Sequence, residues 1–177
     1  MNNIALGIIE GLAKVGEKKL RRRVEVFVSD GKGKILAGKS PEGGFMFPGG
    51  GIDKGETINQ AADRETKEEV GLSIKNVKGI GVSPEVTLWT KRLQDWMNEK
   101  GRTHEGSRTY YRTALVKGED KSLLGKDGDN FKAKFYSIDE IVKGLKRSLK
   151  GAKDKFKPFR ETDKKVLSNV NKSVFSE

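Results

Sequence analysis

The chain has 177 residues, enough for one domain with a hydrophobic core, and 34% of them are hydrophobic. It contains no cysteine and one histidine, which excludes disulfides, thiolate metal sites and a cysteine nucleophile and argues against a metal site built on histidine. No apolar run approaches the roughly 20 residues of a membrane span, and the N-terminus lacks the pattern of a signal peptide. We therefore expect a soluble, cytoplasmic protein without a membrane partner.

The net charge of +11 is unevenly distributed. Residues 141–177 contain eleven lysines and arginines against four acidic residues, a net charge of +7. Such a basic balance favours polyanionic partners, among which nucleotides, RNA, DNA and anionic lipid all qualify. A solvated, solubilising surface explains the same charges equally well.

The N-terminal segment has the spacing of a helix. Ile4, Ile8, Leu12 and Val15 recur at helical intervals, which predicts an amphipathic helix over residues 1–20. This helix would dock on the domain or on a second copy of the chain, so a homodimer is an open alternative.

A hairpin and a glycine run follow. The segment from Arg22 to Ser29 alternates, with Val24, Val26 and Val28 on one face and Arg23, Glu25 and Phe27 on the other, which predicts a half-buried strand. Asp30 to Gly33 predicts a turn, and Lys34 to Gly38 predicts the returning strand. The three glycines at residues 49–51 allow either a close backbone approach to a ligand or a plain tight turn.

Helix signals then bracket residues 57–70. Thr57 and Gln60 form a capping box, and Gly71 occupies the position of a left-handed residue after the last turn, so a helix is predicted from Thr57 to Val70.

The second half of the chain alternates between strand and helix patterns. The expected elements are one or two strands over residues 73–91, a loop or short helix over residues 93–106 carrying Trp96 and His104, a central strand over residues 108–117, a strand over residues 131–137, a helix from the capping box at Ser137 to Leu149, a basic linker over residues 150–158 and a last helix with Val166, Leu167, Val170 and Val174.

Three carboxylates share one arc of the helix over residues 57–70. Glu65, Glu68 and Glu69 are spaced i, i+3 and i+4, so they repel one another. A hard divalent cation such as Mg²⁺ or Mn²⁺ would offset this repulsion, because both ions prefer carboxylate oxygens and substrate phosphates. The alternative is a solvated helix face on which Arg64 and Lys67 form ordinary ion pairs.

The longer pattern around these carboxylates resembles the box motif of the Nudix hydrolase family. The resemblance holds at every fixed position, and the run Phe47–Gly51 is also similar to the family's approach to the box. Thr66 stands where the family has an apolar residue, a small departure. The matching residues are Gly50, Glu56, Arg64, Glu65, Glu68, Glu69, Gly71 and Leu72.

The resemblance implies an α/β fold, the Nudix-type α/β/α sandwich with a mixed central sheet and a catalytic loop-helix-loop. We expect an N-terminal amphipathic helix over residues 1–20, the Nudix domain over residues 21–150 and a basic helical tail over residues 151–177 packed on the same domain.

The resemblance also implies roles for individual residues. Glu65, Glu68 and Glu69 match the family's metal ligands, joined by a carbonyl of the glycine run, for which we take Gly50. Glu65 or Glu68 would orient or deprotonate the attacking water. The expected catalytic set is Glu65, Glu68 and Arg64, with Arg64 positioning the glutamates, Glu56 in support, Mg²⁺ or Mn²⁺ as cofactor, and Trp96, Tyr110 and Arg112 as candidates for substrate binding.

The family often adds an acidic residue from well after the box, close to the final strand. In this chain Lys134 precedes the aromatic Phe135 in that strand. Asp127, Asp129 and Glu105 are alternatives, and none of them is assigned.

The resulting hypothesis is a metal-dependent pyrophosphohydrolase that cleaves the diphosphate linkage of a nucleoside diphosphate derivative by attack of water on phosphorus. One alternative is an RNA 5′-end pyrophosphohydrolase or decapping enzyme. The other is a non-catalytic binding module with the same fold.

Overall fold

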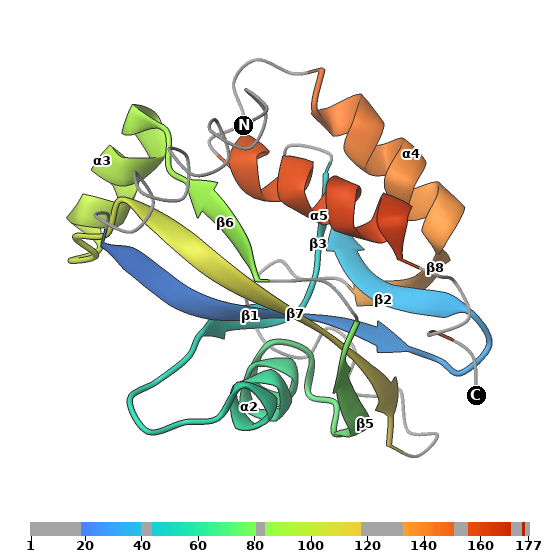
Figure 1. Ribbon diagram of the computed structural model, residues 1–177. Helices are drawn as coiled ribbons and strands as arrows, with labels where there is room; N and C mark the ends of the chain where they lie inside the picture. Colours follow the sequence, from blue (N-terminus) through green and yellow to red (C-terminus); the bar gives the residue numbers. More distant parts are fainter. Residues whose placement is uncertain are drawn as a thin grey trace, which may run out of the picture.

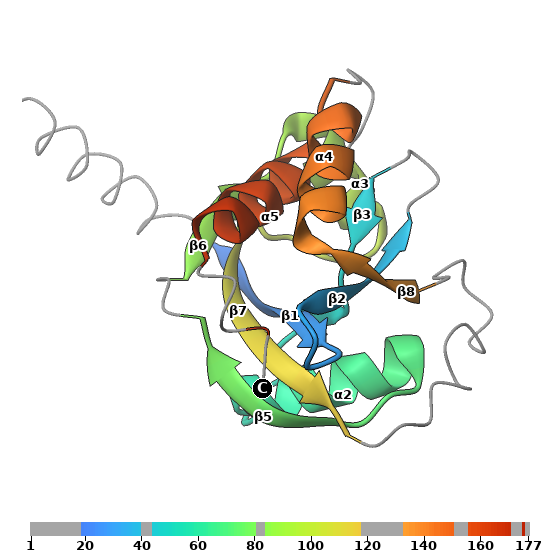
Figure 2. The ribbon, with the colours of Figure 1, turned by 90° about the vertical axis from the view of Figure 1, so that its right-hand side faces the viewer.

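The computed structural model describes residues 19–39, 44–80, 84–117, 133–150, 156–170 and Phe175. The predicted helix of residues 1–20 lies almost wholly outside these ranges, as do Asp127, Asp129 and Val174. One mixed sheet lies between helix α2 on one face and helices α4 and α5 on the other (Figures 1 and 2). This arrangement confirms the predicted α/β/α sandwich. No helix in the described ranges is long and apolar enough to cross a membrane.

The sheet is organised around two long parallel strands, β1 and β7, which pair from Leu20 opposite Gly106 to Ser29 opposite Leu115. The order along the sheet is β3-β2-β1-β7-β5, with β4 paired to β1, β6 to β7 and β8 to β2. The strands are β1 Leu20–Ser29, β2 Lys34–Lys39, β3 Phe45–Met46, β4 Gly49–Gly51, β5 Ile74–Gly79, β6 Glu85–Leu88, β7 Gly106–Val116 and β8 Ala133–Ser137.

The described helices are α2 Ile58–Val70, α3 Lys91–Glu99, α4 Ile138–Ser148 and α5 Lys157–Asn169. Both predicted capping boxes are present, Thr57 with Gln60 before α2 and Ser137 with Glu140 before α4. Gly71 ends α2 in the left-handed conformation, with a φ of 67°. The helix predicted around residues 57–70 is therefore confirmed together with its two end signals.

The two faces of β1 pack against different layers. Val24, Val26 and Val28 are fully buried in the cluster that includes α2. Phe27 is fully buried on the opposite face, in the cluster under α4 and α5, and Glu25 is only 6% exposed. The prediction of a half-buried strand was wrong, because the C-terminal helices cover the face that the sequence pattern left open.

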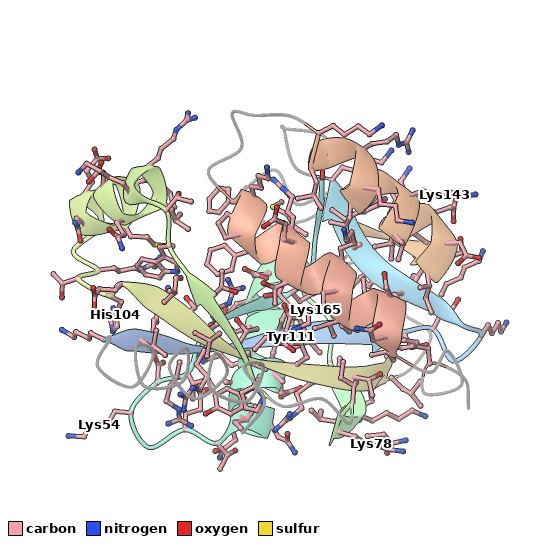
Figure 3. The ribbon with its side chains drawn as sticks, turned by 45° about the horizontal axis from the view of Figure 1, so that its top comes forward. Lys54, Lys78, His104, Tyr111, Lys143 and Lys165 are labelled. Atoms are coloured by element: carbon pink, nitrogen blue, oxygen red, sulfur yellow. The ribbon has the colours of Figure 1, made fainter. Side chains whose placement is uncertain are left out.

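Buried polar contacts hold α5 on the sheet. The hydroxyl of Tyr111 donates to Oδ1 of Asp163 at 2.6 Å, and Figure 3 shows Tyr111 between the sheet and α5. Nη1 of Arg160 donates to the carbonyl of Phe45 at 3.2 Å. Burial raises the pKa of Asp163 to about 6, although the hydrogen bond from Tyr111 lowers it.

Phe175 completes this side of the core, although the sequence pattern did not single it out. Its side chain is fully buried and lies 6.3 Å from the ring of Phe27, centroid to centroid. Its carbonyl accepts hydrogen bonds from the hydroxyl of Ser29 and, at 3.3 Å, from the N–H of Gly33.

Replacing Gly144 of α4 by alanine is expected to lower the free energy of unfolding by about 1–3 kcal/mol, because the added methyl group would overlap the ring of Phe45. Alanine favours a helix over glycine by about 1 kcal/mol, so propensity alone predicts the opposite sign. Chemical denaturation followed by circular dichroism measures the change. Lys146→Ala, on the exposed side of the same helix, is the control and should stay within about 0.5 kcal/mol of the wild type.

Candidate active site

Arg64 is the centre of the candidate site. Its guanidinium binds both carboxylate oxygens of Glu56, with Nε and Nη2 each 2.9 Å from an oxygen. Nη1 donates to Glu65 at 2.9 Å and to Glu68 at 3.2 Å, and Nη2 also donates to the carbonyl of Gly51 at 2.9 Å. One planar cation thus gathers three carboxylates and one strand end, a task suited to the fork geometry of arginine.

Glu69 is held differently from the other glutamates. One of its carboxylate oxygens accepts the N–H of Gly49 at 2.9 Å. Burial raises the pKa of Glu69 to about 7, the hydrogen bond from Gly49 opposes this shift, and the neighbouring Glu65 adds to it. Glu69 therefore loses its proton near neutral pH, where a cation would favour the charged form.

The glycine run makes room for these groups. A methyl group on Gly50 would overlap the carboxylate of Glu65, whereas one on Gly49 would overlap the backbone carbonyl of Val24. A methyl group on Gly51 would overlap the guanidinium of Arg21. Side chains in this run are excluded by the site itself at Gly50 and Gly51, and by the sheet at Gly49.

Arg21, Arg23 and Glu25 of β1 extend the site, and the sequence pattern did not identify them. Arg23 lies opposite Gly51 and Glu25 opposite Gly49 in the pairing of β1 with β4. Arg23 forms an ion pair with Glu25 and lies over the ring of Phe159, 4.9 Å from its centroid. Burial raises the pKa of Glu25 well above its usual range, while Arg23 lowers it.

Arg21 contributes positive charge close to the glutamates. Burial and the neighbouring Arg102 and Arg23 lower its pKa, and the charges of Glu65 and Asp53 raise it. Arg21, Arg23 and Glu25 therefore form a row along one face of β1, about 7 Å apart from one to the next, from the neighbourhood of Glu65 to the buried Glu25.

The three residues predicted to bind substrate lie in different surroundings. Trp96 on α3 packs edge-to-face on Phe156, with ring centroids 5.5 Å apart. Arg112 donates to the side chain of Asn59 at 3.2 Å and to the carbonyl of Tyr111 at 3.0 Å. Tyr110 is half-buried beneath Arg22, on the face of the sheet that α2 shares.

His104 and Glu105 precede β7. Figure 3 places His104 near the start of β1, and its ring lies 6.3 Å from that of Trp89. Glu105 accepts the backbone N–H of Lys19 through its side chain at 3.3 Å. Neither residue is assigned to the chemistry.

The donor atoms suit a hard divalent cation. As they stand, no three acidic or imidazole side chains of the described residues converge on one metal position, since Glu65 and Glu68 bind Arg64 and Glu69 binds Gly49. Even so, the candidate ligands are oxygens, and the protonation of Glu69 is of the kind that a cation would displace. The residue types therefore suit a hard divalent cation.

Comparison with known proteins identifies a family for the chain. The family model of the NUDIX domain matches residues 19–160. The chain is 30% identical over 154 residues to an RNA pyrophosphohydrolase from Vibrio vulnificus (strain YJ016), which covers 80% of this chain and 89% of that enzyme. It is 38% identical over 79 residues to the RNA pyrophosphohydrolase of Vibrio atlanticus (strain LGP32), a match that spans about half of either protein, 43% of this chain and 46% of the enzyme.

Two solved structures share the fold. A MutT protein from Bacillus halodurans is 20% identical with a TM-score of 0.58, covering 85% of this chain and 81% of its own. A NUDIX hydrolase from Nitrosomonas europaea is 20% identical with a TM-score of 0.50, covering 86% and 92%.

Gly50→Ala is expected to weaken Mn²⁺ binding by about tenfold or more, because the methyl group displaces the carboxylate of Glu65. The unfolding midpoint should change little, since the overlap falls on the end of a flexible side chain. Gly49→Ala is the matched variant and should instead destabilise the fold, because its methyl group meets backbone. Titration calorimetry and denaturation measure both. Equal behaviour of the two variants would contradict the positions given to these glycines.

The affinity for Mn²⁺ is expected to depend on pH around the pKa of Glu69, which is about 7. Below that value the proton competes with the metal, so the affinity should fall by up to about tenfold per pH unit; above it the affinity should level off. Calorimetry over about one pH unit on either side measures this, and Glu69→Gln should flatten the profile. A wild-type affinity that is constant through this window would refute the assignment.

Proposed function

The chain belongs to the Nudix family, and we propose that it is a metal-dependent pyrophosphohydrolase that cleaves the diphosphate linkage of a nucleotide by attack of water on phosphorus. The observation that carries this proposal is the set of contacts made by Arg64. It holds Glu56, Glu65 and Glu68 beside the glycine run, where the half-buried Glu69 adds a fourth carboxylate.

The proposed metal ligands are Glu65, Glu68, Glu69 and the carbonyl of Gly50, with Mg²⁺ or Mn²⁺ as the ion. A bound ion of this kind neutralises charge developing on phosphorus and lowers the pKa of a bound water. Arg64 is a positioning residue, because its donors are already occupied by carboxylates and a carbonyl. The side chain of Glu68 is 58% exposed against 13% for Glu65, so Glu68 is the better placed to meet the attacking water.

Arg21 is the proposed partner of the substrate phosphates. Its guanidinium lies against Gly51 and within range of the charges of Glu65 and Asp53. Arg102 adds a second positive charge nearby. A diphosphate held between the glutamate cluster and these arginines would meet metal on one side and guanidinium on the other, the arrangement that phosphoryl transfer requires.

A second candidate is the 5′ end of RNA. Two relatives that align with this chain carry the name RNA pyrophosphohydrolase, and one of them aligns over most of both chains. The same P–O–P chemistry applies, because the triphosphate at an RNA 5′ end contains the linkage that a nucleoside triphosphate contains. We further propose that the activity is cytoplasmic, where both kinds of substrate occur.

A non-catalytic binding module is less well supported. A module freed from catalysis has no need for clustered, mutually repelling carboxylates, and Arg64 here holds three of them at hydrogen-bonding distance.

The test is hydrolysis by the purified chain of nucleoside triphosphates, oxidised nucleotides, ADP-ribose, dinucleoside polyphosphates, and triphosphorylated or capped RNA, with Mg²⁺ or Mn²⁺. At least one substrate should turn over, and reaction in ¹⁸O-labelled water should place the label on a product phosphate. Glu68→Gln should lower kcat by about a hundredfold or more. The ranking of kcat/KM decides between small nucleotides and RNA.

Metal binding without turnover of any substrate by the folded protein would overturn the proposed activity. Turnover that survives unchanged in Glu68→Gln would overturn the role given to that residue.

A further inference from the structure

One half of the sheet face that α2 packs on is not covered by that helix. Figure 1 shows β1 and β7 continuing past the end of α2. Arg22 and Arg108 are exposed there and Tyr110 is half-buried, whereas Val24 on the same face is fully buried under α2. The β6 strand extends this face with Leu88, which is 44% exposed. We call the surface formed by Arg22, Arg108, Tyr110 and Leu88 the β1–β7 platform.

Two like charges lie directly side by side on this platform. Arg22 is the register partner of Arg108 in the parallel pairing of β1 with β7. Neither forms an ion pair with any residue in the described parts of the chain. Like charges in register destabilise a sheet, and within the described residues no acidic side chain neutralises the pair. An anion between the two guanidinium groups would remove the repulsion.

An aromatic ring and an apolar rim accompany the two arginines. The guanidinium carbon of Arg22 lies 5.6 Å from the centroid of the Tyr110 ring. In the row before the arginines, Leu88 lies opposite Gly106, which has no side chain. Guanidinium groups that contact phosphates, beside an aromatic face on which a base can stack, are the combination that binds single-stranded nucleic acid.

The platform adjoins the catalytic loop. The N–H of Ile52, the first residue after β4, donates to the carbonyl of Arg22 at 3.1 Å. Two residues beyond Tyr110 on β7, Arg112 donates to the side chain of Asn59 in the first turn of α2 at 3.2 Å. Neighbouring β-strands lie about 4.8 Å apart, so β4, which borders the glutamate cluster, is one strand spacing from β1 of the platform. An RNA chain that leaves the glutamate cluster therefore reaches the platform at once.

We propose that the β1–β7 platform binds single-stranded RNA whose 5′ end occupies the candidate active site. Arg22 and Arg108 contact successive backbone phosphates, and a base stacks on Tyr110. This proposal rests on the RNA form of the proposed function. It predicts that substitutions in the platform weaken RNA binding and leave the hydrolysis of a mononucleotide unchanged, because a mononucleotide is too short to reach the platform.

The experiment measures binding of a fluorescent single-stranded RNA of about ten nucleotides with a 5′-triphosphate, by anisotropy, at several salt concentrations between about 50 and 200 mM. Relative to the wild type, the double variant Arg22→Gln/Arg108→Gln should bind about tenfold more weakly. Its dependence of log K on log salt should be shallower by about 1.4, because each lost phosphate contact to a single strand removes about 0.7. Tyr110→Ala should weaken binding by about tenfold without changing the salt slope.

Lys146→Gln/Arg147→Gln, which removes two exposed charges from α4 on the other side of the sheet, is the matched control and should keep the wild-type slope. Equal effects of the two double variants, or no effect of either, would overturn the proposal. So would a wild-type dimer by light scattering that the Arg22→Gln/Arg108→Gln variant converts to a monomer, because the face would then be a subunit interface.

Different results would refute the proposal for the platform and the proposed function. Any hydrolysis of a nucleoside triphosphate should be the same in the wild type and in both double variants. The absence of turnover of every nucleotide and every RNA substrate would refute the function alone. A specific loss of RNA binding in Arg22→Gln/Arg108→Gln would still establish the platform.

Discussion

The mutual repulsion of the box carboxylates is the constraint on which the site depends. Arg64 offsets the repulsion for three of these carboxylates, because it donates to Glu56 through two nitrogens and to Glu65 and Glu68 through the third. Glu69 receives one backbone N–H instead, and burial, with the neighbouring Glu65 adding to it, raises its pKa. The position of β4 follows from the same contacts, because the carbonyl of Gly51 is also bound by Arg64.

The site lies beside the central strand β1, whose edge opposite β7 pairs with two different strands. Its C-terminal end meets β2 at Ser29, and its N-terminal half meets β4 at residues 23–25. The strand β3 pairs with β2, and the three glycines of β4 then pair with β1, so backbone without side chains lies next to the carboxylates. The long parallel pairing with β7 on the other edge gives this half of the strand a rigid support.

Local signals predicted the elements of this fold, and long-range contacts decided the rest. Both capping boxes and the left-handed Gly71 lie within a few residues of the helix ends they determine, so the sequence was sufficient for them. The box glutamates could also be recognised, because their spacing is local. The partners of Tyr111 and Phe175 could not be recognised, because Tyr111 binds a residue 52 positions away. The alternation of β1 also gave no sign that α5 would cover the face that carries Glu25.

The sequence Arg21-Arg22-Arg23 shows what such a local pattern conceals. As a run of basic residues it suggests one patch, yet adjacent residues of a strand point to opposite faces. Arg21 and Arg23 lie on the opposite face from Arg22, Arg21 beside Gly51 and Arg23 in an ion pair with Glu25. Arg22 lies on the other face beside Arg108 and remains in solvent. In the two proposals made above, three consecutive arginines therefore have two separate roles: Arg21 neutralises the phosphates that react, and Arg22 neutralises the backbone of the bound RNA.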